Sequence, residues 1–287
     1  LMRKGYSARA YVYAVRDRQM VRKNPTAPTH KTTKKRHPIT NRVVKKKTAI
    51  AGNTRYMLES RACLGDSKYN AAIAYLCKCA IRGGLKPMVL THDIKTHFPT
   101  LEAAVLRAGL VPIMVSGQVK AGSRAEAIQK FNKEPNAVLI GSRVFNEGVN
   151  APAVGVMFLA SAGGKSVTEQ LQRTGRGVRA KAAGLNAVAI FDMMPSGEFN
   201  EKHATQRLSV YEKEKFEIEH VHDVRNIGRR LSRGWKGLLG DRRYERLLSM
   251  QNANSAKSKS QTQKRGQSGK SKKRSKKRVK KRTSKSV

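Results

Sequence analysis

Short apolar runs alternate with longer amphipathic stretches between residues 86 and 216. The apolar runs are nearly continuous, as is typical of parallel strands that are covered on both faces. The longer stretches place apolar residues three and four positions apart, which predicts helices between the strands. The pattern therefore predicts an α/β fold, a parallel sheet with helices on both faces. The predicted strands are Pro87–Thr91, Val111–Val115, Ala137–Gly141, Val154–Leu159 and Ala187–Asp192, and the predicted helices lie near Lys95–Ala108, Ser123–Asn132, Val167–Arg173 and His203–Phe216.

The pattern before residue 86 predicts one strand and a helical region. Tyr and Val alternate with Ala in Ala10–Val15, which favours a strand. Between Asn53 and Ile81 apolar residues recur at helical spacing. Asp66 or Ser67 is a candidate N-cap in this region, and Gly83-Gly84 is the predicted stop.

Two cation-rich segments flank the predicted domain. Val21–Lys47 contains Lys, Arg, Thr and three prolines, so it is predicted as a basic loop or linker. This segment could either contact nucleic acid or be a solvated surface loop without a partner, and the sequence leaves both interpretations open. Residues 251–287 contain no Asp or Glu and little apolar surface, so this tail is expected to be disordered when free. The predicted organisation is a strand and linker in 1–52, the α/β domain in 53–222, a basic helical extension in 223–250 and the tail in 251–287.

The formal net charge of the 287 residues is +41, and the pI is about 10.9. A field of this sign attracts polyanions, so nucleic acid is the predicted partner, ahead of an anionic membrane surface. Cys63, Cys77 and Cys79 form neither an even disulfide framework nor a four-ligand zinc pattern, which predicts a reducing, intracellular compartment and no metal. No apolar run has the length of a membrane span. Because Leu1 precedes Met2, we expect a fragment of a longer reading frame.

Small or polar residues follow three of the predicted strands directly. The carboxyl ends of parallel strands lie at one edge of a sheet, where ligands bind in open α/β folds. Short side chains and free backbone N–H groups allow phosphates to approach closely, so these loops are candidate nucleic-acid contacts, with ordinary turn residues as the alternative. The three pairs are Thr91 and His92, Ser116 and Gly117, and Ser142 and Arg143.

The densest group of chemically active residues is the segment 172–179, with the sequence QRTGRGVR. Its three arginines are separated by small residues, so one short segment can present several guanidinium groups to phosphate oxygens. Such an arrangement stabilises charge on a transferring phosphoryl group. A surface ion-pair cluster on a helix is the alternative, but acidic residues are scarce nearby.

The segment 172–179 resembles motif VI of the superfamily 2 helicases, Gln-x-x-Gly-Arg-x-x-Arg, and matches it in full. Ser142–Asn150 resembles motif V, and Ser116–Phe131 resembles the motif between IV and V, with Gly117 at the matching position. The order of these motifs agrees with the family. Because Phe191–Val221 also fits, the resemblance is closest to the bacteriophage UvsW-type helicases. It implies the fold of a RecA-like helicase C-terminal lobe.

The resemblance implies roles for individual residues. Arg176 and Arg179 correspond to arginine fingers that reach the γ-phosphate of ATP, and Gln172 senses the nucleotide state. In motif V, Asn150 stands where the family has an aspartate, and Arg143 stands where relatives have an acidic residue, so both contacts are expected to differ. The remaining implied contacts are Gly148, Asn150, Gly175 and Arg173 to the nucleotide, and Thr91, His92, Gly117, Ser142, Arg143 and Lys165 to nucleic acid.

A complete helicase motor also needs a Walker A lysine and an acidic pair that holds Mg²⁺. The sequence supplies neither, because Gly163–Ser166 lacks the first glycine of a Walker A loop: Leu159 occupies its position. The resemblance therefore implies ATP with Mg²⁺ held by an N-terminal lobe, in cis or in trans, and no ATP hydrolysis by this chain alone.

Two functions remain open on the sequence. The first is the C-terminal motor lobe of an ATP-dependent helicase or translocase, for which the resemblance favours DNA as the substrate. Its expected location is the cytoplasm, which is that of a bacterial host cell if the chain is phage-encoded. The alternative is a non-enzymatic basic nucleic-acid-binding protein on a helicase-lobe scaffold.

Overall fold

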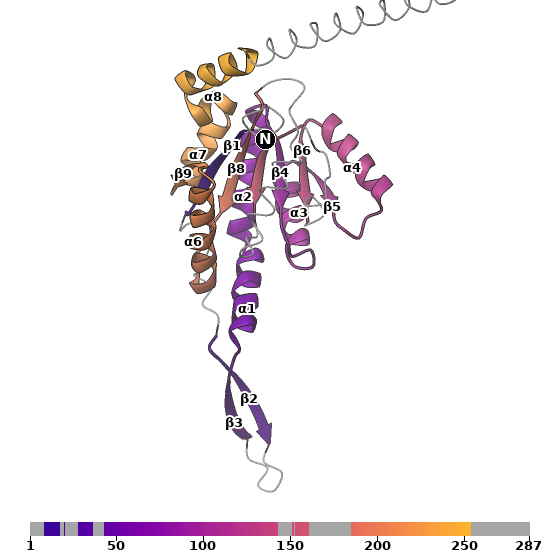
Figure 1. The fold of residues 1–287 in the computed structure, drawn as a ribbon. Helices are drawn as coiled ribbons and strands as arrows, with labels where there is room; N and C mark the ends of the chain where they lie inside the picture. The colour runs from indigo at the N-terminus through magenta and orange to yellow at the C-terminus, as the bar shows by residue number, and fades with distance from the viewer. Residues whose placement is uncertain are drawn as a thin grey trace, which may run out of the picture. The chain divides into compact units, whose positions relative to one another are not determined.

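The computed structural model describes residues 9–17, 20, 28–36, 43–142, 151, 153–160 and 185–253. The chain divides into two compact units, Leu1–Leu238 and Leu239–Val287. The first unit contains a sheet whose described strands number seven, in the order β5-β6-β4-β7-β8-β1-β9 (Figure 1). Every neighbouring pair in this sheet is parallel. The strands are β1 (Arg9–Val15), β4 (Lys86–Leu90), β5 (Val111–Val115), β6 (Ala137–Gly141), β7 (Val154–Leu159), β8 (Ala187–Met193) and β9 (Glu217–Val221).

Helices cover both faces of this sheet, as predicted. One face carries a core in which Met88, Leu139 and Ile190 pack with Phe131 of α4 and Tyr211 of α6. On the other face α2 packs against β4 and α3 packs against β5, and α7 packs against α2. The α/β fold with a covered parallel sheet is therefore confirmed. The helices are α1 (Gly52–Leu64), α2 (Ser67–Arg82), α3 (His97–Arg107), α4 (Ala121–Lys133), α6 (Glu198–Lys213), α7 (Val224–Leu231) and α8 (Gly234–Leu239).

The predicted start and stop of helix α2 are both confirmed. The Asp66 carboxylate accepts hydrogen bonds from the backbone N–H groups of Lys68 and Tyr69, at 2.8 and 3.1 Å, and so caps the first turn. The helix ends at Gly83, where a Cβ atom would lie 2.2 Å from the carbonyl oxygen of Leu231. Glycine is therefore required here because the ends of α2 and α7 approach each other backbone to backbone.

The predicted basic linker is wrong for much of its length. β2 (His30–Arg36) and β3 (Val43–Ala49) form an antiparallel hairpin, in register from His30 opposite Ala49 to Arg36 opposite Val43. The ladder hydrogen bonds satisfy the backbone whatever the side chains are, so a lysine-rich segment can still pair. We call β2 and β3 the basic hairpin (Figure 1).

The predicted domain boundaries at residues 53 and 222 do not coincide with the sheet. β1 lies before residue 53 and pairs with β8 on one side and with β9 on the other. The alternation in Ala10–Val15 predicted a strand but could not indicate its neighbours, because parallel partners are distant in sequence. At the other end, α7 belongs to the first unit and buries Ile227 and Leu231.

The second unit begins at Leu239, and its described part is a helix over residues 241–253. A basic helical extension was predicted for residues 223–250, which overlap this helix. The predicted helix at Val167–Arg173 and most of the predicted tail lie outside the described residues. None of the described helices combines the length and apolar character that a bilayer crossing requires.

Candidate nucleic-acid interface at the carboxyl edge of the sheet

The loops that follow β4, β5 and β6 begin side by side at the carboxyl edge of the sheet. The N–H of Thr91 donates to the carbonyl of Gly141, at 3.0 Å, and the N–H of Ser142 donates to the carbonyl of Val115, at 3.1 Å. These bonds continue the ladders one residue beyond the strands. The predicted clustering of Thr91, Ser116 and Ser142 at one edge is therefore observed, and all three side chains are buried.

A buried histidine fixes the start of the loop after β4. The Nδ1 atom of His97 lies 2.9 Å from Oγ1 of Thr91, and its Nε2 atom lies 2.9 Å from Oδ1 of Asn70. The amide nitrogen of Asn70 donates to the carbonyls of Leu64 and Asp66, so its oxygen faces His97 and accepts. The imidazole therefore carries its hydrogen on Nε2, and Nδ1 accepts the hydrogen of the Thr91 hydroxyl.

This network keeps His97 neutral and commits the Thr91 hydroxyl. Burial lowers the pKa of His97 to about 3, helped by the nearby His92 and opposed by Asp93. The N–H of Asp93 also donates to Oγ1 of Thr91, at 3.3 Å. Because the hydroxyl hydrogen of Thr91 is donated within the protein, this residue positions the loop rather than offering its hydroxyl to a phosphate. Its contact with nucleic acid stays a prediction.

His92, a more accessible member of the predicted set, lines an open cavity of about 540 Å³. Asp93 and Lys95 of the same loop also lie in its wall, together with Gln118 of the loop after β5. Gly117, next to Gln118, is exposed, and a Cβ atom there would meet nothing within 4 Å. The protein's own packing therefore does not require glycine at 117, which leaves room for a ligand at this position. Helix α1 completes the cavity with Tyr56, Met57, Ser60 and Arg61.

Helix α1 is held at this edge by a carboxylate that the sequence analysis missed. Glu59 is 1% exposed, and its oxygens accept hydrogen bonds from the backbone N–H groups of Phe199 and Asn200, at 3.0 and 2.8 Å. These N–H groups belong to the first turn of α6, so a residue of α1 caps another helix. Gly197 precedes that turn with a φ of 139°, and a Cβ atom there would lie 2.5 Å from Glu59. This tertiary cap explains why α6 begins five residues before the predicted His203.

A second missed group lies beneath the end of β8. Arg207 of α6 donates from Nε to Asp192, at 2.8 Å, and Tyr211 donates its hydroxyl to the same carboxylate, at 2.7 Å. All three side chains are buried. Burial opposes the charge of Arg207, but the Asp192 carboxylate outweighs it and raises the pKa of the guanidinium. An Asp that ends an apolar strand is the sequence signal that could have indicated this group.

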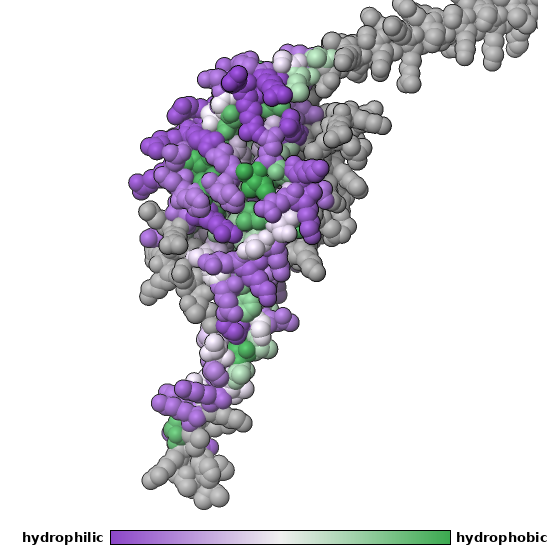
Figure 2. All heavy atoms as spheres, turned by 60° about the vertical axis from the view of Figure 1, so that its left-hand side comes forward, coloured by the Kyte–Doolittle hydropathy of each residue, from purple (hydrophilic) through white to green (hydrophobic). Residues whose placement is uncertain are grey.

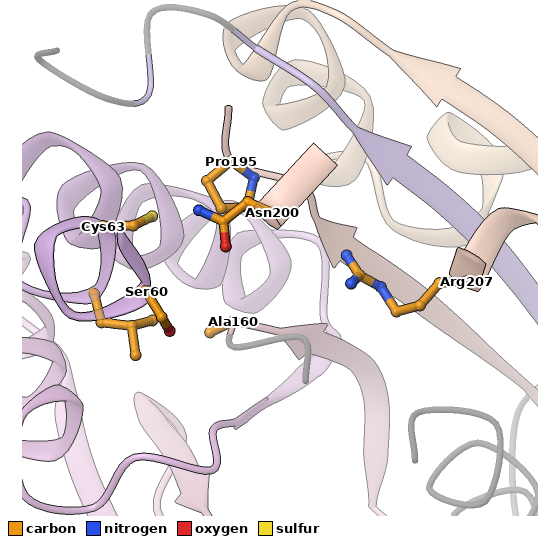
Figure 3. A pocket seen from close by; sticks show the side chains of 7 residues that line it. Ser60, Cys63, Ala160, Pro195, Asn200 and Arg207 are labelled. Carbon is orange, nitrogen blue, oxygen red and sulfur yellow. The ribbon is translucent and has the colours of Figure 1, made fainter. Parts of the chain in front are cut away.

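Arg207 also lines a cavity of about 10 Å³, shown in Figure 3, which has room for one water molecule at most. Ser60 and Cys63 come from α1, Asn200 and Arg207 come from α6, and Ala160 follows β7. Burial raises the pKa of the Cys63 thiol to about 12, with Asp66 and Glu59 adding to the effect. The thiol is therefore neutral and unreactive. The cavity is a small packing gap where α1 meets α6.

All three cysteines lie in the described part of the chain. Cys63, Cys77 and Cys79 are free and buried there. The described residues bring together no three His, Cys, Asp or Glu side chains that could hold a metal ion.

The remaining predicted site residues fall outside the described part of the chain, so their positions relative to the carboxyl edge stay predictions. Ser142 is the last described residue of the motif V segment, and Ala160 is the last one before the motif VI segment. The residues concerned are Arg143, Gly148, Asn150, Lys165, Gln172, Arg173, Gly175, Arg176 and Arg179.

Comparison with known proteins supports the fold assignment. The sequence of residues 68–181 matches the helicase conserved C-terminal domain. The structure of T4 UvsW superposes with a TM-score of 0.53 and 16% sequence identity, over 75% of this chain and 41% of the UvsW chain. The chain thus spans less than half of UvsW. No curated protein sequence matches significantly.

Two further solved structures are similar at lower scores. E. coli DEAD-box protein SrmB, bound to the regulator RraA, has a TM-score of 0.43 and 20% identity, over 54% of this chain and 84% of the SrmB chain. S. cerevisiae Dbp5, bound to RNA and ADP BeF3, has a TM-score of 0.41 and 17% identity, over 56% of this chain and 42% of the Dbp5 chain. Residues 68–181 thus match the helicase conserved C-terminal domain, and the parallel sheet described above has a RecA-like fold similar to that of T4 UvsW.

Proposed function

We propose that this chain is the C-terminal motor lobe of an ATP-dependent nucleic-acid helicase or translocase. It would work with an N-terminal lobe that binds ATP, in cis or in trans. One observation carries the proposal: a single domain match over residues 68–181 takes in both the described loops at the carboxyl edge and the arginine segment 172–179. A basic protein without motor function has no need for this combination.

In the proposed motor, this chain contributes charge to the nucleotide and contacts to the nucleic acid. Arg176 and Arg179 would stabilise the charge that develops on the γ-phosphate, and Gln172 would respond to the nucleotide state. The described residues supply no cluster that fits Mg²⁺, so the proposal assigns the metal to the N-terminal lobe. The bound nucleotide supplies the phosphoryl chemistry. The further nucleotide contacts in the proposal are Gly148, Asn150, Gly175 and Arg173.

The carboxyl edge would bind the nucleic-acid strand. His92 lines the open cavity, and the exposed Gly117, next to the lining residue Gln118, allows a phosphate to approach the backbone. Ser142 starts the neighbouring loop, and Arg143 and Lys165 follow it in the sequence. The resemblance to UvsW favours DNA as the substrate.

The decisive experiment measures nucleic-acid-stimulated ATP hydrolysis by the chain mixed with its N-terminal lobe. Arg176→Ala and Arg179→Ala should each lower the rate by about 10³- to 10⁵-fold, the effect of an arginine finger. Arg229→Ala is the matched control, because Arg229 is exposed on α7 and has no part in the proposed site. Unchanged hydrolysis in both finger variants would overturn the motor proposal.

That last outcome would favour the alternative, a non-enzymatic nucleic-acid-binding protein on a helicase-lobe scaffold. Its supporting observation is the charge of +41, which gives affinity for polyanions without any nucleotide chemistry. The two functions differ in one measurement: the alternative predicts nucleic-acid binding that is unaffected by ATP and by the N-terminal lobe.

A further inference from the structure

The basic hairpin carries a dense and uniform charge. Its two strands have the sequences HKTTKKR and VVKKKTA, so seven of their fourteen residues are Lys or Arg. The sequence contains no Asp or Glu between Asp17 and Glu59. In Figure 2 the hairpin, at the bottom of the view as in Figure 1, is mostly coloured as hydrophilic where it is not grey. Packing against an apolar core therefore does not explain this element.

The strand register gathers four cations on one face of the hairpin. Side chains alternate between the two faces of a strand, and directly paired residues share a face. Lys34 is paired with Lys45, so the residues two positions away, Arg36 and Lys47, lie on the same face. All four side chains are exposed. We call Lys34, Arg36, Lys45 and Lys47 the cationic face.

The cationic face is unfavourable on its own. Like charges that lie directly opposite each other in an antiparallel pair destabilise it, and Lys34 opposite Lys45 is such a pair. Cβ atoms of directly opposite residues are only about 5 Å apart. A polyanion that neutralises this face would remove the repulsion.

The dimensions of the hairpin fit a duplex. Residues two apart along a strand are separated by about 6.8 Å, and the two strands by about 4.8 Å. A two-stranded β-ribbon can enter a major groove about 12 Å wide, between two rows of phosphates. Binding of single strands relies on aromatic side chains that stack on bases. The sequence has no Phe, Tyr or Trp from Ala14 to Arg55, so the hairpin favours a duplex backbone over a single strand.

The topology places the root of the hairpin at the carboxyl edge. β1 runs parallel to the other strands, so the chain leaves the sheet after Val15 at the same edge as the loops after β4, β5 and β6. The N–H of Ile50 donates to the carbonyl of Thr29, at 2.9 Å, and closes the base of the hairpin. Helix α1 begins two residues later and lines the open cavity with His92 and Gln118.

We propose that the cationic face of the basic hairpin binds the phosphate backbone of duplex nucleic acid. The hairpin is then a contact separate from the loops that are proposed to hold the translocating strand. The contact is electrostatic and independent of sequence, because the face carries charges and no group that is fixed to read base edges. This contact requires neither a nucleotide nor a second lobe. The hairpin proposal can therefore be tested independently of the proposed motor function.

The test compares salt dependence in the full chain. The variant Lys34→Gln, Arg36→Gln, Lys45→Gln and Lys47→Gln is titrated with a fluorescent DNA duplex at several salt concentrations and without ATP. The slope of log K against log salt should become shallower by about 3 to 4, because each lost phosphate contact removes about 0.9. Slopes are compared rather than affinities, because the cations of residues 254–287 contribute their own term to both proteins.

Two matched variants isolate the hairpin. Lys130→Gln, Lys133→Gln, Lys202→Gln and Lys213→Gln together remove the same charge from exposed positions on α4 and α6 and should leave most of the slope intact. Lys34→Arg, Lys45→Arg and Lys47→Arg keep the charge and should keep the slope. Far-UV circular dichroism should match that of the parent protein, and the unfolding midpoint should be equal or higher, because the Gln variant removes repulsion from the hairpin.

Three outcomes would overturn the proposal. One is a slope that changes no more in the hairpin variant than in the α4 and α6 control. Another is an equal loss of slope on a single strand of the same length, which would assign the face to single-stranded nucleic acid. The third is a loss of affinity for vesicles of anionic lipid with unchanged duplex binding, which would assign it to a membrane surface.

Discussion

Lowering the pH should destabilise the carboxyl edge through His97. The folded protein holds this imidazole neutral, with a pKa of about 3, whereas an unfolded chain binds the proton with a pKa near 6.5. Between these two values the unfolded state binds more protons, so stability is complete above pH 6.5 and falls as the pH falls toward 3. The free energy of unfolding should fall by about 1.4 kcal/mol per pH unit once the pH is well below 6.5, and by about 2.3 kcal/mol in all between pH 6.5 and 4.5.

The measurement is urea unfolding of the parent protein and of His97→Gln at half-unit steps from pH 7 to 4.5. Glutamine does not titrate, so its curve should be flatter by the amount above. The variant is expected to be less stable at pH 7, since Thr91 and Asn70 lose their partner. Only the difference in slope tests the reasoning, because carboxylates and the partly buried His203 titrate in both proteins. Parallel curves would refute the neutral, buried state of His97.

The same titration should be visible at the loop after β4. A protonated His97 donates from both ring nitrogens, so it can no longer accept the hydrogen of the Thr91 hydroxyl. The N–H of Asp93, which donates to the same hydroxyl oxygen, should then exchange faster with solvent. Hydrogen exchange of Asp93 should be measured at pH 3, where about half of the folded protein carries a protonated His97. Corrected for the intrinsic rate, it should be faster there than expected from its value at pH 7.

Three substitutions test the contacts that hold the helices around this edge, each read from the urea midpoint of unfolding. Glu59→Gln should cost about 1 to 2 kcal/mol, because the cap of α6 loses its charge. Arg207→Met should cost about 3 to 5 kcal/mol, because it leaves the carboxylate of Asp192 buried without its partner. Gly83→Ala should cost about 1 to 3 kcal/mol, because its Cβ atom would overlap the carbonyl oxygen of Leu231. A midpoint within error of the parent value would contradict the contact concerned.

The central strands could be predicted from the sequence because each buried strand is a run of consecutive apolar residues. Ala137–Gly141 is an unbroken apolar run, and all five residues are buried in the sheet. The helix α2 was equally readable, since its cap and its stop are local features. Such elements depend on the order of neighbouring residues, which a sequence states directly.

The elements that the pattern did not reveal owe their place to distant residues. β9 (Glu217–Val221) lies at the edge of the sheet, and the charges of its Glu and His residues hide the strand pattern. The basic hairpin lacks apolar alternation, because neither of its faces meets a core. In the candidate site, Glu59 and His97 act on groups far along the chain, Phe199 and Asn70. No spacing rule connects residues that meet only through the fold.

The position of β1 determines how the basic hairpin is attached to the lobe. β1 lies between β8 and β9 in the sheet, and in the sequence the hairpin follows β1 and precedes α1. The hairpin is therefore connected to the lobe at both of its ends. After β1, the N–H of Arg16 donates to the carbonyl of Val221, and the carboxylate of Asp17 accepts from the N–H of Val224, so the chain stays fixed to β9 and α7 beyond the last residue of the strand. After β3, the chain enters α1, which Glu59 ties to α6. A charged ribbon whose flanking segments are held on both sides can present a duplex in a set relation to the lobe.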